Sequence, residues 1–296
     1  MKKPISILLQ TTIPTTEDDW SIWRFSLLRD YIASLKDEAG NKLCEVTARD
    51  RESDSDGNDP LLSTLERSNF DQLWLFALDV GEGLTEKDCE GINAFRQRGG
   101  GILTTRDHQD MGCSMCGLGD IGAVHYFNTK NPHPDESHRA IDDTYTTYIS
   151  WPNYHSGRNG DYQKITPVEP IHELLYNPNS PSGFVEFFPT HPHEGAIGVP
   201  AGAKNARAIA LGKSLITGRP FNLAVVIESE KDARGNALGR TVAASSFHHF
   251  CDYNWDIDKG CPSFVDEAPG DGMKKEPRAL EDIKTYVRNV VLWLRP

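Results

Sequence analysis

Short apolar runs and segments with helical spacing alternate along the first third of the chain. The apolar runs predict strands at residues 4–12, 43–47, 71–79 and 102–105. Between them, apolar side chains recur at helical spacing in residues 20–36, 61–67 and 85–98. The last of these helices has Thr85 as its predicted cap and ends at Gly99 and Gly100. This alternation predicts a parallel sheet with right-handed crossovers.

The alternation stops after residue 108 and resumes later. Residues 109–170 are rich in Gly, Pro, Asn, His and Tyr and have little periodicity, which is typical of a functional loop or lid. Beyond them, hydrophobic patterning predicts strands at 183–189, 206–211, 221–228 and 240–247 and a terminal helix at 279–294. We therefore expect a single α/β domain over residues 1–296, a three-layer sandwich with a mostly parallel sheet and a long loop-rich insertion.

Three polar segments each follow a predicted strand. They are Arg106-Asp107-His108-Gln109-Asp110, the segment 190–195 and the segment 245–252. Because ligands of open α/β sheets bind outside the carboxyl ends of the strands, we expect the three segments to meet at one edge and form a site. They hold five of the ten histidines, so proton transfer or metal binding is the candidate chemistry.

Proton transfer near neutral pH is typical of a histidine oriented by a carboxylate. The candidate catalytic residues of this kind are Asp107, His108, His193, Glu194 and His248. His193 or His248 is the expected base, and Asp107 or Glu194 is its expected orienting partner. The candidate substrate-binding residues are Arg106, His191, His249, Trp151 and Tyr154. Since neighbours on a strand point to opposite faces, at least one of His248 and His249 is expected to be structural.

A divalent metal ion is the alternative chemistry for the same segments. Its ligands would be His193, His248 and Asp107, a mixed set of nitrogen and oxygen donors, although their spacing matches no known metal motif. No other cofactor is expected.

The cysteines offer a further alternative. Cys113 and Cys116 form a Cys-x-x-Cys pair, but Cys251 and Cys261 lie ten residues apart, without the spacing of a zinc knuckle. We therefore favour free thiols over a zinc site. Cys113 stays open as a nucleophile, which would need a nearby base or helix N-terminus to activate it.

Composition narrows the classes of partner. The net charge of −12 argues against binding to a nucleic-acid backbone, which needs a basic face. No apolar stretch reaches the roughly 18 residues of a membrane span. The apolar run after Met1-Lys2-Lys3 is too short for a secretion signal, so we expect a cytoplasmic protein with reduced thiols and a small-molecule ligand.

The region from residue 71 to 103 resembles a known family. Its buried strand 71–79, the helix that follows and the sequence Gly99-Gly100-Gly101-Ile102-Leu103 are similar to the class I glutamine amidotransferase-like superfamily, most of all to its ThuA-like branch. The resemblance covers residues 1–108 and 183–296. It implies a flavodoxin-like sandwich of parallel strands between helices.

At the site, the resemblance implies a changed activity. Arg106 stands where the amidotransferases carry their nucleophilic Cys, and Pro192-His193-Glu194 resembles their His-Pro-Glu in altered order. The protein is therefore not expected to be a glutaminase of the usual Cys-His-Glu type. ThuA-like proteins are linked to the use of trehalose and other sugars. They often carry His at the position of Arg106, two residues before His108, and Gly-His where this chain has Ser246-Phe247-His248-His249.

These observations leave three functions open. The first is a hydrolase or isomerase/lyase that acts by His/Asp acid–base chemistry on a small polar molecule, with carbohydrate-derived compounds as candidates. In it, Arg106 would bind an anionic or carbonyl oxygen, and Trp151 and Tyr154 would stack on a sugar. The second is a non-catalytic ligand-binding or assembly subunit, and the third a metal-dependent hydrolase. A homo-oligomer is compatible with each.

Overall fold

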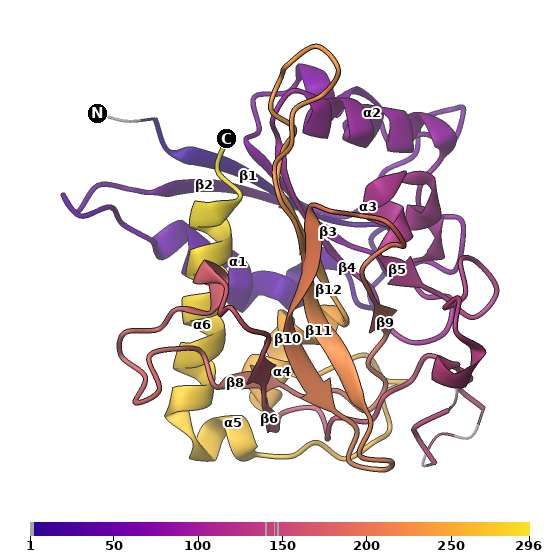
Figure 1. The fold of residues 1–296 in the computed structure, drawn as a ribbon, viewed down its shortest axis with the longest axis vertical. Helices are drawn as coiled ribbons and strands as arrows, with labels where there is room; N and C mark the ends of the chain where they lie inside the picture. Colours follow the sequence, from indigo (N-terminus) through magenta and orange to yellow (C-terminus); the bar gives the residue numbers. More distant parts are fainter. Residues whose placement is uncertain (1–2, 140, 145, 147) are drawn as a thin grey trace.

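A computed structural model describes residues 3–139, 141–144, 146 and 148–296. Eight strands form one sheet in the order β2-β1-β3-β4-β12-β11-β10-β7 (Figure 1). They are β1 Ile5–Thr11, β2 Cys44–Arg49, β3 Gln72–Phe76, β4 Gly101–Thr105, β7 Thr166–Pro167, β10 Ala206–Lys213, β11 Pro220–Ile227 and β12 Thr241–Ala244. In this order the strands from β2 to β12 are parallel to one another, whereas β11, β10 and β7 each run antiparallel to the strand before them.

The parallel half of the sheet has the strand order 2-1-3-4-5, counted in sequence, which is that of the flavodoxin-like fold. The predicted α/β class with a mostly parallel sheet is therefore confirmed. Two further pairs lie outside the sheet: β5 His125–Tyr126 with β9 Ala196–Ile197, and β6 Tyr162–Lys164 with β8 Phe187–Pro189.

Helices cover both faces of the sheet (Figure 1). Packed into the larger hydrophobic cluster are α1 Ser26–Ser34, α4 Asp252–Trp255, α5 Gly272–Lys275 and α6 Pro277–Trp293. Packed into the cluster on the other face are α2 Glu86–Gln97 and, through Ile121, α3 Asp120–Ala123. Short 3-10 helices complete the chain: η1 Ile22–Phe25, η2 Leu62–Arg67, η3 Cys113–Gly117, η4 Glu136–His138, η5 Glu173–Leu175, η6 Phe247–His249 and η7 Ile257–Lys259.

The central strands are buried on both faces, which explains their uninterrupted apolar sequence. In β3, Trp74 and Phe76 pack into one cluster, and Leu73 and Leu75 pack into the other. At α2 the predicted cap is confirmed: the Asp88 amide donates to Thr85 Oγ1 at 3.1 Å, and Asp88 Oδ2 accepts from the Thr85 amide at 3.1 Å.

The glycines before β4 are required by close packing. A Cβ on Gly101 would lie 2.1 Å from the carbonyl oxygen of Leu294, and one on Gly100 would lie 2.3 Å from the Phe95 ring. These contacts let the terminal segment after α6 and the end of α2 approach the start of β4 directly. The glycines thereby fix where β4 begins, and so where its carboxyl end presents the residues that follow.

Some predicted elements are shorter than expected. The helix predicted at 20–36 begins as the 3-10 helix η1, and the strand predicted at 240–247 ends at Ala244. The strand predicted at 183–189 is only β8, which pairs with β6 and not with the central sheet. The insertion 109–170 carries only short elements, one of which, β7, forms an edge of the sheet.

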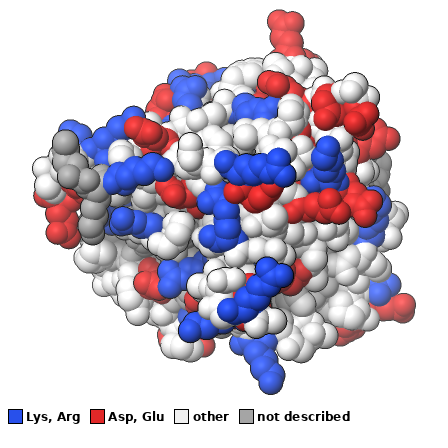
Figure 2. Space-filling model, turned by 90° about the horizontal axis from the view of Figure 1, so that it is seen from above, with Lys and Arg blue, Asp and Glu red and all other residues white. Residues whose placement is uncertain are grey.

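The surface carries charges of both signs. On the face seen in Figure 2, basic and acidic side chains are interspersed and not gathered by sign. Among the described residues, no helix is both long and apolar enough to cross a lipid bilayer.

Candidate functional site

The three polar segments meet at the carboxyl edge of the parallel strands, as expected. β4 and β12 are neighbours, with Thr105 opposite Ala244, so the residues after them leave the sheet side by side. The Phe247 amide donates to the Arg106 carbonyl at 2.9 Å. The third segment joins them because the Gly195 amide donates to the Ser245 carbonyl at 3.1 Å.

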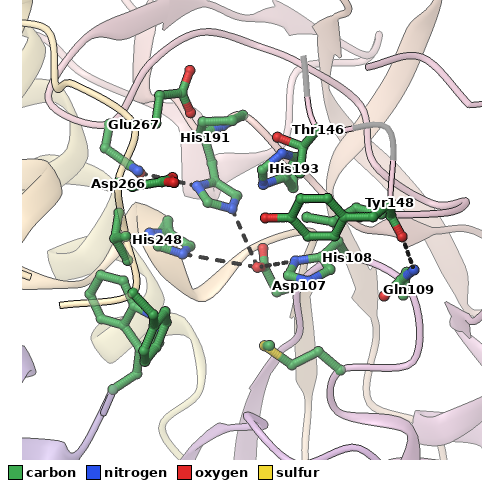
Figure 3. A pocket seen from close by; sticks show the side chains of 17 residues that line it. Asp107, His108, Gln109, Thr146, Tyr148, His191, His193, His248, Asp266 and Glu267 are labelled. Atoms are coloured by element: carbon green, nitrogen blue, oxygen red, sulfur yellow. Dashed lines mark hydrogen bonds and ion pairs between the residues drawn. The ribbon is translucent and has the colours of Figure 1, made fainter. Parts of the chain in front are cut away.

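Asp107 is the centre of the resulting cluster (Figure 3). Its Oδ2 lies 2.9 Å from His108 Nδ1, 3.3 Å from His191 Nε2 and 3.9 Å from His248 Nε2. Its Oδ1 accepts a hydrogen bond from Ser246 Oγ at 3.0 Å. Burial alone would raise the pKa of Asp107, but His191 and His108 outweigh burial and hold it well below its usual range.

His191 and His248 stack on each other behind Asp107. Their ring centroids are 3.5 Å apart, and the planes differ by 9°. His191 Nδ1 lies 3.0 Å from Asn159 Oδ1, and His248 Nδ1 lies 3.1 Å from Asn254 Oδ1. Burial is the largest influence on both rings and lowers the pKa of each.

His193 belongs to a second pair of a histidine with an aspartate. Its Nε2 lies 2.8 Å from Asp143 Oδ2. Its ring centroid lies 5.5 Å from that of His108 and 5.5 Å from that of His191. His193 therefore joins the Asp107 cluster through these two rings.

A cavity of about 370 Å³ opens over the cluster. Its polar lining includes Asp107, His108, His191, His193 and His248, and its apolar lining includes Trp20, Met111, Ile149, Phe264 and Val265. The insertion contributes Thr146 and Tyr148 to the rim, and Asp266 and Glu267 lie across from the histidines (Figure 3). Burial raises the pKa of Glu267.

Glu194 and His249 form a separate centre that does not line this cavity. Glu194 Oε1 accepts from Ser156 Oγ at 2.9 Å and from Gln163 Nε2 at 2.8 Å, and Oε2 accepts from Ser245 Oγ at 2.7 Å. His249 Nε2 lies 3.1 Å from the same carboxylate. His248 and His249 thus point to different centres, although they lie on η6 and not on a strand.

Three predicted substrate-binding residues lie behind the cavity wall and not in it. Arg106 is completely buried and donates to backbone carbonyls of Asp107, Gln109 and Tyr126, so it fixes loops and presents no donor to the cavity. Burial lowers its pKa to about 9. Tyr154 stacks on Phe221 with ring centroids 4.9 Å apart, and Trp151 is buried in the core.

The cysteines do not line the cavity, although Cys251 Sγ lies 3.8 Å from His248 Nδ1. All six belong to the described residues and are free thiols. Cys113 packs in the cluster of α2 and Cys251 in that of α1 and α6, so the two pairs cannot share one zinc ion. Burial raises the pKa of Cys113 to about 11, which leaves its thiol protonated and unsuited to act as a nucleophile.

Potential metal ligands form two groups among the described residues. One comprises Asp107, His191 and His248, and the other His108, His191 and His193, with the ligand atoms of each group within 4.8 Å of one another. The predicted set of Asp107, His193 and His248 is neither of these. His191 takes the place of His193 because its ring, stacked on His248, brings Nε2 next to Asp107.

Several partners in the site have no signal in the sequence. Asn159, Asn254 and Asp143 lie in loops or a short helix, and their contacts with the histidines join distant segments. Asn254, six residues after His248, is the one whose position near a candidate ligand is visible in the chain. An Asn or Asp in a loop is usually a turn residue, so its type alone indicates no role.

Comparisons with known proteins give distant similarities. No family model and no curated protein matches the sequence. The cytoplasmic protein STM1381 from Salmonella typhimurium LT2 is 10% identical, and the match covers 99% of this chain and 100% of that chain with a TM-score of 0.48. The N-terminal domain of mmIFT52 is 13% identical, and the match covers 86% of this chain and 91% of that chain with a TM-score of 0.47. The glutaminase domain of Trypanosoma brucei CTPS, solved with bound acivicin, is 12% identical, and the match covers 96% of this chain and 94% of that chain with a TM-score of 0.41.

Proposed function

We propose that this protein is a ThuA-like enzyme on the scaffold of the class I glutamine amidotransferases, and that it moves protons on a small polar, carbohydrate-derived substrate. The observation that carries the proposal is a pair of Asp–His couples at one cavity. One couple is His108 with Asp107, and the other is His193 with Asp143. Both histidines line the cavity, and their ring centroids are 5.5 Å apart.

Each couple can orient an imidazole for proton transfer. Asp107 holds Nδ1 of His108, so Nε2 of that ring is the nitrogen available to a substrate. Asp143 lies 2.8 Å from Nε2 of His193, so in that ring Nδ1 is the nitrogen available to a substrate. A substrate between the rings can lose a proton to one and gain a proton from the other, which suits isomerisation, elimination or hydrolysis with water as co-reactant.

The rest of the cavity supports a carbohydrate-derived substrate. Trp20 and Phe264 offer aromatic surface, and Tyr148 from the insertion stands at the rim. These side chains replace Trp151 and Tyr154 as the groups expected to stack on a sugar. Glu267 and Asp266 add acceptors for hydroxyl groups on the opposite side (Figure 3).

The location proposed for the enzyme is the cytoplasm. Six free thiols, four of them buried, are compatible with a reducing compartment, where disulfides seldom form. In this proposal, the insertion 109–170 serves as the lid of the cavity, because Tyr148 and Ile149 come from it.

The test is a substrate screen with matched variants. Wild type, His108→Asn and His193→Asn are incubated with sugars, sugar acids and sugar amides, and turnover is followed by proton NMR in heavy water. We expect exchange or conversion of a compound by wild type and a loss of at least about 100-fold in either variant, the range of general acid–base catalysis. His133→Asn, outside the cavity lining, is the control and should keep full activity.

The opposite result favours a non-catalytic subunit. If wild type binds compounds from the panel, seen as a rise in melting temperature, but converts none of them, the enzymatic proposal fails. Equal turnover in wild type and in both variants would also exclude the two couples as the catalytic groups.

A further inference from the structure

The hydrogen bonds behind the stacked histidines determine which ring nitrogen carries the proton. Asn254 Nδ2 donates to the carbonyl of Thr190 at 2.7 Å and to Asn159 Oδ1 at 3.1 Å. Its Oδ1 is therefore the acceptor that faces His248 Nδ1, and Cys251 Sγ donates to the same oxygen at 3.1 Å. Because that oxygen can only accept, Nδ1 of His248 is the protonated nitrogen.

The same reasoning applies to His191. Asn159 Oδ1 already accepts the amide of Asn254, so it also acts as an acceptor toward His191 Nδ1. A histidine that binds a metal ion through one ring nitrogen carries its single N–H on the other nitrogen. Nδ1 of each ring faces an amide oxygen, so the lone pair that each ring offers to a ligand at the cavity is on Nε2 in both His191 and His248.

These two lone pairs face a carboxylate. Asp107 Oδ2 lies 3.3 Å from His191 Nε2 and 3.9 Å from His248 Nε2. The buried His191 Nε2 makes no hydrogen bond to any described residue, and His191 is 5% exposed. Three electron-pair donors thus converge where a cation would satisfy all of them.

We propose that Asp107, His191 and His248 bind one divalent transition-metal ion of the zinc or iron(II) type. Their ligand atoms lie within 4.8 Å of one another, and two imidazoles with one carboxylate are typical ligands of these ions. Asn159 and Asn254 occupy the outer positions, where a ligating histidine usually donates its second N–H. All three ligands line the cavity, so an open coordination position would face a substrate.

The other group of three is the weaker candidate. His193 Nε2 lies 2.8 Å from Asp143 and His108 Nδ1 lies 2.9 Å from Asp107, so each is closer to a carboxylate than His191 Nε2, at 3.3 Å, is to Asp107. That group also contains no carboxylate of its own. Only the group with Asp107 has its tautomers set by amide oxygens.

Metal binding should change the stacking of the two rings. A nitrogen lone pair lies in the plane of its ring, so two rings with planes only 9° apart cannot both point at one ion. We expect the planes to open by a clear rotation in a metal-bound crystal structure, with both Nε2 atoms about 2.0–2.1 Å from the ion.

This inference stands on its own geometry and deepens the proposed function without depending on it. A bound ion would act as a Lewis acid beside the two Asp–His couples. Its test needs no substrate, so failure of the metal site and failure of proton transfer by His108 and His193 can be told apart.

The experiment is calorimetric titration of chelator-treated protein with Zn²⁺, and separately with Co²⁺, which reports ligand type in its visible spectrum. We expect one ion per chain, no thiolate charge-transfer band, and an affinity reduced at least 100-fold in His191→Ala and in His248→Ala. Asn254→Ala should reduce it 10- to 100-fold, as for other outer partners of metal-bound histidines. His193→Ala, the matched control, should stay within about threefold.

Two outcomes would overturn the site. One is wild-type protein that binds neither ion under these conditions. The other is binding that His193→Ala abolishes and His248→Ala leaves intact, which would assign the ion to His108, His191 and His193. Circular dichroism and thermal melting of each variant show whether a lost site reflects a lost fold, and Asn254→Ala provides a milder variant should His248→Ala unfold.

Discussion

Two carboxylate–histidine centres lie next to each other in this protein and differ in the groups that face the carboxylate. At Glu194, every neighbour of the carboxylate is a donor: Ser156, Gln163, Ser245 and His249. At Asp107, Ser246 and His108 donate, but His191 and His248 present Nε2 to the carboxylate while their Nδ1 atoms face amide oxygens.

The two centres also differ in access. Glu194 and His249 are completely buried and absent from the cavity lining, whereas Asp107 and His248 line the cavity. Yet Glu194 follows His193 directly and His249 follows His248 directly in the chain. A fully satisfied carboxylate without access holds loops together, and an incompletely satisfied one at a cavity is available for a ligand.

The largest expected effect is at the structural centre. Glu194→Ala removes the acceptor shared by four buried donors and leaves His249 without its carboxylate. We expect a loss of about 3–5 kcal/mol in the free energy of unfolding, as for breaking other buried ion pairs. Urea unfolding followed by fluorescence measures it.

The control is a His–Glu pair near the surface. His172 Nε2 lies 3.2 Å from Glu228 Oε1, and the Glu228 side chain is 44% exposed. Glu228→Ala should therefore change the free energy of unfolding by about 1 kcal/mol or less. Comparable losses in Glu194→Ala and Glu228→Ala would show that the buried network adds nothing, and the proposed contrast between the centres would fail.

The sequence predicts the scaffold because the central strands can be recognised from their uninterrupted apolar runs. A run such as 71–79 is apolar at every position only when both faces are covered, and β3 is packed in this way. β4 and β12 then bring Asp107 and His248 together because register places their ends side by side. Strand pairing thus carries the prediction that the polar segments converge.

What the sequence does not predict depends on contacts between loops. His191, and not the predicted His193, lies beside Asp107 because its ring stacks on His248. Asn159 and Asn254 are positioned by hydrogen bonds between side chains of distant segments. Burial of Arg106 behind the wall depends on carbonyls of segments far along the chain, including Tyr126. Periodicity reports which face of an element is apolar and gives no information about such contacts.

A pH measurement with a third buried histidine sharpens the comparison. His125 belongs to neither centre: its Nε2 lies 2.9 Å from Thr104 Oγ1, and burial lowers its pKa to about 3. Below the ordinary pKa of about 6.5, the unfolded chain binds a proton at this residue and the folded chain does not until about pH 3. Stability therefore falls as the pH falls through this window, with His125 contributing up to about 1.4 kcal/mol per pH unit.

In His125→Asn that contribution disappears. We expect the free energy of unfolding, measured by urea titration from pH 7 to pH 4.5, to fall less steeply than in wild type. Parallel profiles would mean that burial of His125 does not resist protonation.

The smallest expected effect is the most direct test of the contrast, because one chemical change is made at both centres. In Asp107→Asn, the new amide can donate to the lone pair of His191 Nε2 while its oxygen still accepts from Ser246. The partly exposed His108, whose Nδ1 faces the same position, accepts from the amide in its other tautomer. In chelator-treated protein we expect the free energy of unfolding to change by less than about 1 kcal/mol. In Glu194→Gln, the new amide instead faces donors, and a loss of about 1–3 kcal/mol is expected for an unsatisfied buried group. If Asp107→Asn loses as much as Glu194→Gln in the absence of metal, then Asp107 is satisfied by its histidines as they stand, those rings carry protons on Nε2, and no cation is needed between them.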